Sequence, residues 1–159
     1  MIKALLFDFS RVLLFPKEEK YTGKLNDLIA KVSQKLHFHF FDYFVFNAEL
    51  LAYLENIKDR YDLYIFTTGA IQNELQVRRR VDAVFRKLYS AKKMGLSKKD
   101  PNSYKHIAHD LKLKPNEILF IDDALENIEA AQSANLKTIH YISNKQLLHD
   151  LEMLLKLYE

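Results

Sequence analysis

Apolar runs of strand length alternate with amphipathic stretches along most of the chain. Five of these runs have the length and composition of β-strands: residues 2–9, 62–68, 87–91, 117–123 and 137–143. The first, second and fourth runs are almost continuously apolar, which is typical of strands that are buried on both faces. The pattern therefore predicts a parallel sheet that is covered by helices.

Helical patterns lie between and after the predicted strands. They cover residues 47–59, 70–80, 101–112, 124–134 and 144–157. The third predicted helix has a clear beginning, because Asp100 is a favourable N-cap and Pro101 suits the first helical position. Alternating strands and helices predict a doubly wound, Rossmann-like α/β fold with three layers, in which helices cover both faces of a parallel sheet.

One segment, residues 17–46, interrupts this alternation. It is longer than a simple connection requires, and it contains a helical pattern over residues 24–36 followed by the aromatic-rich stretch "HFHFFDYFVF". Aromatic-rich stretches usually form buried packing. We expect residues 17–46 to form a small helical cap inserted after the first strand, with residues 1–16 and 47–159 as the α/β core.

The composition limits the chain to one ordinary domain. With 159 residues, 48% of them hydrophobic, it can build one well-formed core. The absence of cysteine excludes disulfide bonds, thiolate metal sites and a cysteine nucleophile. The first residues show no signal-peptide cleavage site, and no run approaches the roughly 20 apolar residues of a membrane span. We therefore expect a cytoplasmic protein without a membrane partner, and the sequence leaves its oligomeric state open.

Positive charge is concentrated in one part of the chain. The formal net charge is only +3, but residues 78–99 carry nine Lys or Arg and one acid, Asp82. Such a run could attract phosphate-bearing ligands or nucleic acid. It spans a helix, a strand and a loop without a nucleic-acid signature. We therefore interpret it as a solvated surface in which Lys98 is functional, and we expect no nucleic-acid partner.

Polar residues that can carry chemistry follow the predicted strands. Ligands of open parallel sheets bind at the carboxyl ends of the strands. The residues at these ends, or just before the third helix, are Asp8, Thr67, Thr68, Lys98, Asp122 and Asp123. Carboxylates can hold Mg²⁺, a Thr hydroxyl with nearby backbone N–H groups can bind phosphate, and a Lys can neutralise the remaining charge. The set predicts phosphoryl transfer with a carboxylate nucleophile.

Four segments, in this order, resemble the signature motifs of the haloacid dehalogenase-like (HAD) hydrolase superfamily: "LLFDFS", "IFTTGA", "GLSKKDP" and "ILFIDDALEN". The resemblance extends from residue 1 to about residue 142, and it implies a Mg²⁺-dependent hydrolase of a phosphorylated small molecule. Asp8 would be the nucleophile. The implied contacts to the phosphoryl group are Thr67, Thr68, Gly69 and Lys98. The implied metal ligands are Asp8, the Ser10 backbone carbonyl, Asp122 and Asp123.

The chain departs from the family pattern two residues after the nucleophile. Phosphatases of the superfamily usually have a second Asp there, followed by Gly, whereas this chain has Ser10 and Arg11. The missing Asp would protonate the leaving group and later activate water, which typically contributes on the order of 10² to 10⁴ in rate. A Ser hydroxyl cannot exchange protons usefully at neutral pH. Arg11 is a candidate substrate contact at the mouth of the site, or it simply replaces Gly with a solvated side chain, which we favour.

Three functions are compatible with this departure. The first is a Mg²⁺-dependent phosphohydrolase that acts through an aspartyl-phosphate, with turnover that is weakened or specialised for good leaving groups. The second is a binding or regulatory protein that keeps the metal site without turnover. The third is a dehalogenase or a phosphonatase-like hydrolase, although the pair Asp122 and Asp123 weighs against the halide branch, which does not use Mg²⁺. We favour the first.

Overall fold

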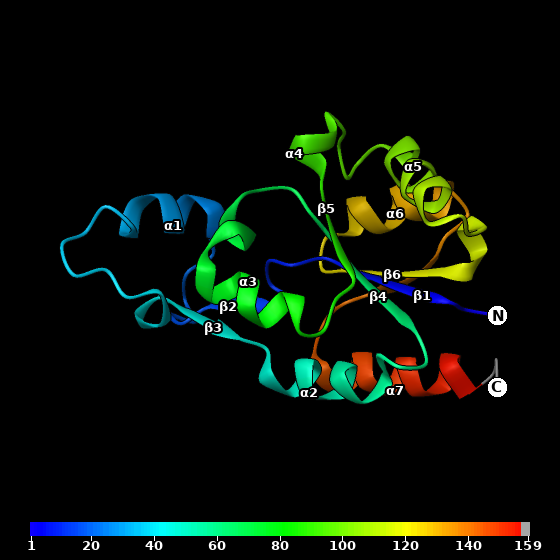
Figure 1. The fold of residues 1–159 in the computed structure, drawn as a ribbon, viewed down its shortest axis with the longest axis horizontal. Helices are drawn as coiled ribbons and strands as arrows, with labels where there is room; N and C mark the ends of the chain where they lie inside the picture. The colour runs from blue at the N-terminus through cyan, green and yellow to red at the C-terminus, as the bar shows by residue number, and fades with distance from the viewer. Residues whose placement is uncertain (157–159) are drawn as a thin grey trace.

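The structure, a computed structural model, describes residues 1–156, and its centre is a parallel sheet of five strands (Figure 1). The strands are β1 (Ala4–Phe7), β4 (Asp62–Thr67), β5 (Lys87–Ser90), β6 (Ile118–Asp122) and β7 (Lys137–His140). Their order in the sheet is β5-β4-β1-β6-β7, so the chain builds outwards from β1 to β5 and then continues on the other side of β1. The predicted doubly wound α/β fold is confirmed. Its strand order reverses between β1 and β6, where such folds bind ligands.

Helices cover both faces of this sheet. One face is covered by α2 (Ala48–Ile57), α3 (Leu75–Asp82) and α7 (Asn144–Lys156), and the other by α5 (Pro101–Leu111) and α6 (Leu125–Ser133). In Figure 1, α2 and α7 lie below the sheet and α5 and α6 lie above it. The fold therefore has the three layers that the alternating pattern predicts.

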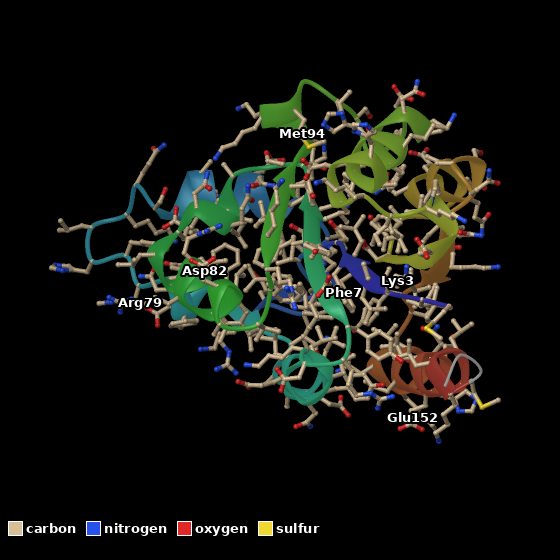
Figure 2. The ribbon with its side chains drawn as sticks, turned by 45° about the vertical axis from the view of Figure 1, so that its right-hand side comes forward. Lys3, Phe7, Arg79, Asp82, Met94 and Glu152 are labelled. Atoms are coloured by element: carbon tan, nitrogen blue, oxygen red, sulfur yellow. The ribbon has the colours of Figure 1, made fainter. Side chains whose placement is uncertain are left out.

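The burial of β1 on both faces explains why its sequence is apolar without interruption. Successive side chains of a strand point to opposite faces. Leu5 and Phe7 therefore pack in the core beside α2 and α7, while Ala4 and Leu6 pack in the core beside α5 and α6. All four are fully buried. Figure 2 shows Phe7 within the sheet and Lys3 near the amino end of β1, and Asp8 directly follows the carboxyl end of this strand.

The helix predictions for the α/β core agree with the structure except around residues 70–80, whereas the helix predicted over residues 24–36 ends at Val32. Asp100 caps α5 as expected, because its carboxylate accepts a hydrogen bond of 2.9 Å from a backbone N–H in the first turn. Residues 70–80 instead contain two elements, the 3-10 helix η2 (Ile71–Asn73) and α3. The extended backbone of Glu74 separates them.

In the described part of the α/β core, two short helices have no counterpart in the prediction. They are α4 (Ala91–Met94), which follows β5, and the 3-10 helix η3 (Pro115–Glu117), which precedes β6. Elements of three or four residues are too short to produce a periodic pattern. Residue 157, the last of the predicted C-terminal helix, lies outside the described residues. Within residues 1–156 no helix is both long enough and apolar enough to cross a membrane.

Residues 14–46, here called the insert, lie between β1 and α2 and extend to one side of the main sheet (Figure 1). They contain a two-stranded antiparallel sheet of β2 (Leu14–Pro16) and β3 (Phe44–Phe46), together with α1 (Leu25–Val32) and the 3-10 helix η1 (Phe40–Asp42). The sequence predicted only helical structure here. Strands of three residues show no alternation from which they could be predicted.

The insert packs on the same apolar core as the sheet. Leu25 and Ile29 form part of the buried side of α1. Phe40 and Phe44 are buried and stacked, with ring centres 4.7 Å apart, which confirms buried packing for these members of the aromatic stretch. Phe41 is 51% exposed and does not follow this prediction. Because α1 is anchored in the core, its first turn has a fixed position beside the carboxyl edge of the sheet.

Candidate functional site

Asp8 and Asp122 lie side by side at the carboxyl end of the sheet. In the pairing of β1 with β6, Phe7 lies opposite Ile121. The residues that come next, Asp8 after β1 and Asp122 at the end of β6, therefore lie opposite each other. The Asp8 N–H donates to the Ile121 carbonyl at 2.8 Å, which extends the pairing to this point. Opposite residues of paired strands point to the same face. The register therefore brings together two carboxylates that are far apart in the sequence.

Lys98 joins these two carboxylates. Its ammonium Nζ lies 2.5 Å from Asp8 Oδ1 and 2.6 Å from Asp122 Oδ2. The Lys98 side chain is 5% exposed and the Asp122 side chain is fully buried. Attraction between opposite charges is stronger in such surroundings than in water. The loop before α5 therefore delivers a cation to the point where β1 and β6 end.

Tyr104, near the beginning of α5, holds Lys98 in this position. The Tyr104 hydroxyl donates to the Lys98 carbonyl at 2.6 Å. Its ring packs edge-on against Phe66 and Phe120, with centre distances of 5.5 and 5.0 Å. The Lys98 ammonium lies 5.6 Å from the centres of the same two phenylalanine rings. Sequence reasoning missed the role of Tyr104, because the residue is simply one of the apolar positions of its helix.

The pKa values of the charged groups depart from their ordinary range. Burial raises the pKa of Asp8 to about 7, although Lys98 opposes the shift and Asp122 adds to it. Burial alone would lower the pKa of Lys98, but the carboxylates of Asp8 and Asp122 outweigh burial and hold that pKa above its usual value. Lys98 is therefore a cation at neutral pH. Groups perturbed by burial and by a specific partner are typical of functional sites.

Three carboxylates could hold a divalent cation. Oxygen atoms of Asp8, Asp122 and Asp123 all lie within 4.8 Å of one another. Asp122 is fixed on both sides, since Oδ1 accepts from the Ala124 N–H at 2.8 Å and Oδ2 accepts from Asn127 Nδ2 at 3.0 Å. Mg²⁺ prefers oxygen ligands of this kind and is commonly bound through one or two carboxylates. The donor set therefore fits Mg²⁺.

Ser10 lies in the loop that follows Asp8. A parallel bridge pairs Ser10 with Leu14. The hydrogen bonds of this bridge run from the Leu14 N–H to the Phe9 carbonyl, at 3.1 Å, and from the Arg11 N–H to the Leu14 carbonyl, at 2.7 Å. They do not use the Ser10 carbonyl. Its role as a metal ligand stays a prediction.

Thr67 is the last residue of β4, and Thr68 and Gly69 begin the loop that follows this strand. Strand β4 is the neighbour of β1, so this loop starts at the same edge of the sheet as Asp8. Thr67 is buried, Thr68 is exposed and Gly69 is half-buried. The sheet thus places the loop next to the carboxylate cluster, on the β4 side of β1. Contact of these residues with a phosphoryl group stays a prediction.

Arg11 has a structural role that the sequence did not suggest. Its guanidinium Nη2 donates to the carbonyls of Tyr21, at 2.9 Å, and Gly23, at 2.6 Å. These bonds tie the loop after β1 to the insert. Arg11 also has a φ of 63°, in the left-handed region that favours glycine. This backbone explains why Gly suits the position, and contact of Arg11 with a substrate stays a prediction.

Comparison with known proteins assigns a family to the chain. The family model described as haloacid dehalogenase-like hydrolase matches residues 9–141. The chain belongs to this family. The resemblance on which the sequence analysis relied is therefore confirmed, and the protein is a member of the HAD-like hydrolase family.

Curated relatives of this HAD hydrolase include two proteins named enolase-phosphatase E1. The chain is 36% identical over 84 residues to the protein from Aquifex aeolicus, a match that covers 50% of this chain and 37% of that protein. It is 33% identical over 81 residues to the protein from Pseudomonas fluorescens, covering 49% of this chain and 36% of that protein. The chain therefore spans less than two fifths of the length of these relatives.

Solved HAD structures share the fold over nearly the whole chain. A HAD family enzyme from Bacteroides thetaiotaomicron, in complex with magnesium and inorganic phosphate, has a TM-score of 0.68 at 20% identity, covering 91% of this chain and 96% of that one. A HAD-like family hydrolase from Porphyromonas gingivalis has a TM-score of 0.68 at 18% identity, covering 98% of each chain. At these identities the likeness concerns the fold.

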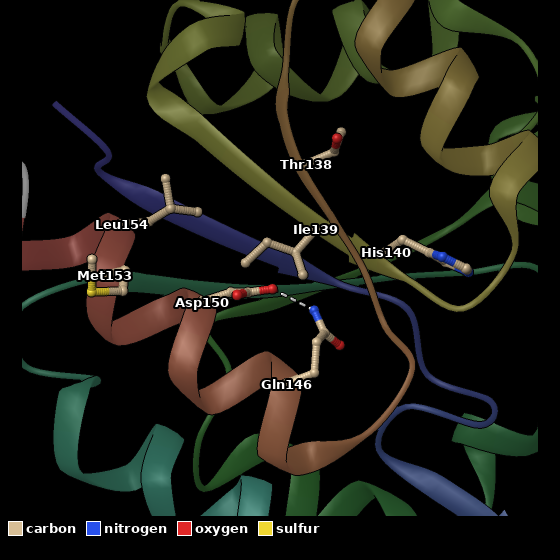
Figure 3. A pocket seen from close by; sticks show the side chains of 7 residues that line it. All are labelled: Thr138, Ile139, His140, Gln146, Asp150, Met153 and Leu154. Atoms are coloured by element: carbon tan, nitrogen blue, oxygen red, sulfur yellow. Dashed lines mark hydrogen bonds between the residues drawn. The ribbon is translucent and has the colours of Figure 1, made fainter.

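A hollow of the HAD-family protein, with a volume of about 450 Å³, lies away from the carboxylate cluster, between β7 and α7 (Figure 3). Ile139, Met153 and Leu154 give it apolar walls. Gln146 donates to Asp150 at 2.5 Å, so two of its polar side chains are paired with each other. This hollow is a weaker candidate for chemistry than the carboxylate cluster.

The basic run has its charges on different elements. Arg79 lies on the outer side of α3, near Asp82 (Figure 2), and Arg78 pairs with Asp82 at 2.9 Å. Lys98, by contrast, is buried against the carboxylates. For the arginines the structure agrees with the interpretation of a solvated surface, and the functional role of Lys98 stays a prediction.

Proposed function

We propose that this HAD hydrolase is a Mg²⁺-dependent phosphohydrolase that acts through an aspartyl-phosphate on Asp8. The observation that carries the proposal is the position of Lys98, 2.5 Å from Asp8 Oδ1 and 2.6 Å from Asp122 Oδ2, beside a set of three carboxylates. A cation next to a carboxylate nucleophile can stabilise the charge of an incoming phosphoryl group. The enolase-phosphatase relatives and the phosphate complex of the Bacteroides enzyme support this substrate chemistry.

In the first step a carboxylate oxygen of Asp8 attacks phosphorus. A bond forms between that oxygen and phosphorus, and the bond from phosphorus to the leaving group breaks, so the leaving group departs with the electron pair. Lys98 and the Thr67 hydroxyl hold the phosphoryl oxygens in this arrangement. Asp8, Asp122, Asp123 and the Ser10 carbonyl would hold Mg²⁺, which when bound neutralises negative charge on the phosphoryl group.

In the second step water attacks phosphorus and the bond to Asp8 breaks. The carboxylate is restored, phosphate leaves, and the water proton passes to solvent. No carboxylate stands at position 10 to accept that proton, because the residue is Ser10. We therefore propose that this step is slow, and that substrates with good leaving groups, such as acyl or aryl phosphates, suit the first step.

Phosphate release from acetyl phosphate tests the proposal. The wild-type protein should release phosphate in the presence of Mg²⁺ and lose this activity when the metal is chelated. Asp8→Asn should reduce the rate at least about a hundredfold, because the neutral amide of Asn is too weak a nucleophile to attack phosphorus. Asp59→Asn, at an exposed carboxylate of the α2–β4 loop, is the matched control and should keep the wild-type rate. Equal rates for Asp8→Asn and wild type would contradict the proposal.

A further inference from the structure

Asn26, in the first turn of α1, reaches the loop that follows β4. Its Oδ1 accepts two hydrogen bonds, from the Ala70 N–H at 2.9 Å and from the Ile71 N–H at 3.0 Å. Two consecutive backbone donors thus converge on one side-chain oxygen. The loop that follows Thr67 therefore takes part of its conformation from the insert.

Gly69 is shaped for the same contact. A Cβ atom at position 69 would lie 2.0 Å from Asn26 Nδ2 and 2.2 Å from Asn26 Cγ, far inside van der Waals distance. The Asn26 side chain consequently occupies the space where any other residue at position 69 would place its side chain. Gly69 is required here for close approach of the insert.

A buried side-chain amide also bonds to the backbone of this loop. Gln72, which is 1% exposed, donates from Nε2 to the Gly69 carbonyl. The Gly69–Ile71 stretch is therefore held by a buried amide of its own segment, three residues after Gly69, and by an amide of the insert. Of the two, the amide of Asn26 belongs to an element that is separate from the sheet.

The insert is also tied to the loop that carries the nucleophile. Arg11, three residues after Asp8, donates to the Gly23 carbonyl just before α1 begins. Leu25, next to Asn26, is 2% exposed and anchors the helix in the core. The first turn of α1 and the residues just before it therefore touch the two loops between which a phosphoryl group would sit.

We propose that Asn26 is a positioning residue that couples the insert to the Gly69–Ile71 loop and so sets how tightly that loop holds a phosphoryl group. The inference rests on the proposed phosphohydrolase function, in which Thr67, at the end of β4 just before this loop, holds the phosphoryl group. Since coupling between two contacts is reciprocal, phosphate bound at the loop should in turn strengthen the contact of the insert.

Hydrogen exchange of the peptide that contains residues 68–73 tests the coupling without any turnover. Asn26→Ala should increase the exchange of the Ala70 and Ile71 amides at least about tenfold, because both lose their acceptor. Asn26→Asp keeps an oxygen in the same place and should restore the protection. Asn73→Ala, at an exposed side chain of η2, is the control and should exchange like wild type. Unchanged exchange in Asn26→Ala would overturn the proposal.

A double-mutant cycle tests the effect on the phosphoryl group. With Mg²⁺ present, Asn26→Ala should raise the KM for acetyl phosphate and weaken the binding of inorganic phosphate, each about tenfold, with a smaller change in kcat. A variant that was merely less stable would lower kcat without changing KM. Gly69→Ala should weaken phosphate binding similarly, and the double variant should be no worse than either single variant. Additive losses would overturn the coupling.

The two arms separate failure of this inference from failure of the proposed function. If the wild-type protein neither hydrolyses acetyl phosphate nor binds phosphate, the phosphohydrolase proposal fails, and the role of Asn26 in phosphate binding fails with it. If the wild type is active but Asn26→Ala keeps its KM and its phosphate affinity, only the inference about Asn26 fails.

Discussion

The Lys98 ammonium lies 2.5 Å from the Asp8 carboxylate, in a pair that is almost completely removed from water. A second carboxylate, Asp122, lies 2.6 Å from the same ammonium. One cation thus compensates two buried acids. This arrangement makes the site electrostatically dependent on Lys98, with consequences for stability as well as for activity.

Replacement of Lys98 should therefore destabilise the fold. Lys98→Met keeps the length of the side chain but leaves Asp8 and Asp122 without a counter-charge, and breaking a buried ion pair in this way costs on the order of 3 kcal/mol. Urea unfolding in a metal chelator should show this loss, and added Mg²⁺ should restore part of it. Lys99→Met is the matched control, because the Lys99 side chain is 68% exposed and its pairing with Glu126 is on the surface. Equal losses for both variants would contradict the account.

Asn127 should control the Mg²⁺ requirement through Asp122. Its Nδ2 donates to Asp122 Oδ2 at 3.0 Å, and removal of such a supporting hydrogen bond typically weakens metal affinity by about 10- to 100-fold. Asn127→Ala should raise the Mg²⁺ concentration for half-maximal activity by this factor. It should also reduce the increase in Tm that Mg²⁺ gives the wild type. Asn116→Ala, at an exposed position, should behave like wild type. An unchanged Mg²⁺ midpoint in Asn127→Ala would count against the metal site.

The left-handed backbone at Arg11 predicts an unusual order of stability. Both Arg11→Gly and Arg11→Ala lose the two hydrogen bonds to the insert, but only Gly adopts a φ of 63° without strain. Arg11→Gly should therefore be more stable than Arg11→Ala by about 1 kcal/mol, measured by urea unfolding. At an ordinary position Ala would be the more stable of the two, and that order would show that the left-handed backbone is not present in solution.

Asp110 should give the fold a small dependence on pH. Its Oδ2 accepts from Lys87 Nζ at 2.6 Å and from the Tyr89 hydroxyl at 2.5 Å, and these bonds lower the pKa of Asp110. A carboxylate whose folded pKa is lowered stabilises the fold at neutral pH, and this contribution is lost as the pH falls through the folded pKa. Because the side chain is 42% exposed, Asp110→Asn should cost less than about 1 kcal/mol at pH 7.

Urea unfolding of the wild type and of Asp110→Asn at pH 7 and about pH 3 checks the direction of this effect. The difference between the two proteins should be smaller at the lower pH. A difference that grows as the pH falls would contradict the assigned sign.

The sequence predicted the sheet and its helices because their apolar patterns are long and regular. It also predicted that Asp8, Lys98 and Asp122 belong to one site, since all three follow strand ends or precede a helix. It could not predict the two-stranded sheet of β2 and β3, because three residues carry no periodic signal. The split between η2 and α3 depends on the extended backbone of Glu74, for which the sequence has no marker.

The long-range contacts of Asn26 and Tyr104 could not be predicted from the sequence for a different reason. Asn26 is a polar residue at the start of a helix, and nothing in its surroundings along the chain indicates the backbone donors of Ala70 and Ile71. Tyr104 occupies an apolar helix position that would suit core packing alone. Such roles depend on how the insert and α5 are oriented against the sheet, and this orientation follows from packing.

The central claim is that Asp8 forms a phosphoenzyme which Ser10 leaves slow to break down. Intact-mass spectrometry after brief mixing with acetyl phosphate and Mg²⁺ tests it directly. We expect an adduct of about 80 Da on the wild type, none on Asp8→Asn, and a shorter-lived adduct on Ser10→Asp, because a carboxylate can then activate water. Absence of the adduct from both wild type and Ser10→Asp, or an equal adduct on Asp8→Asn, would contradict the account.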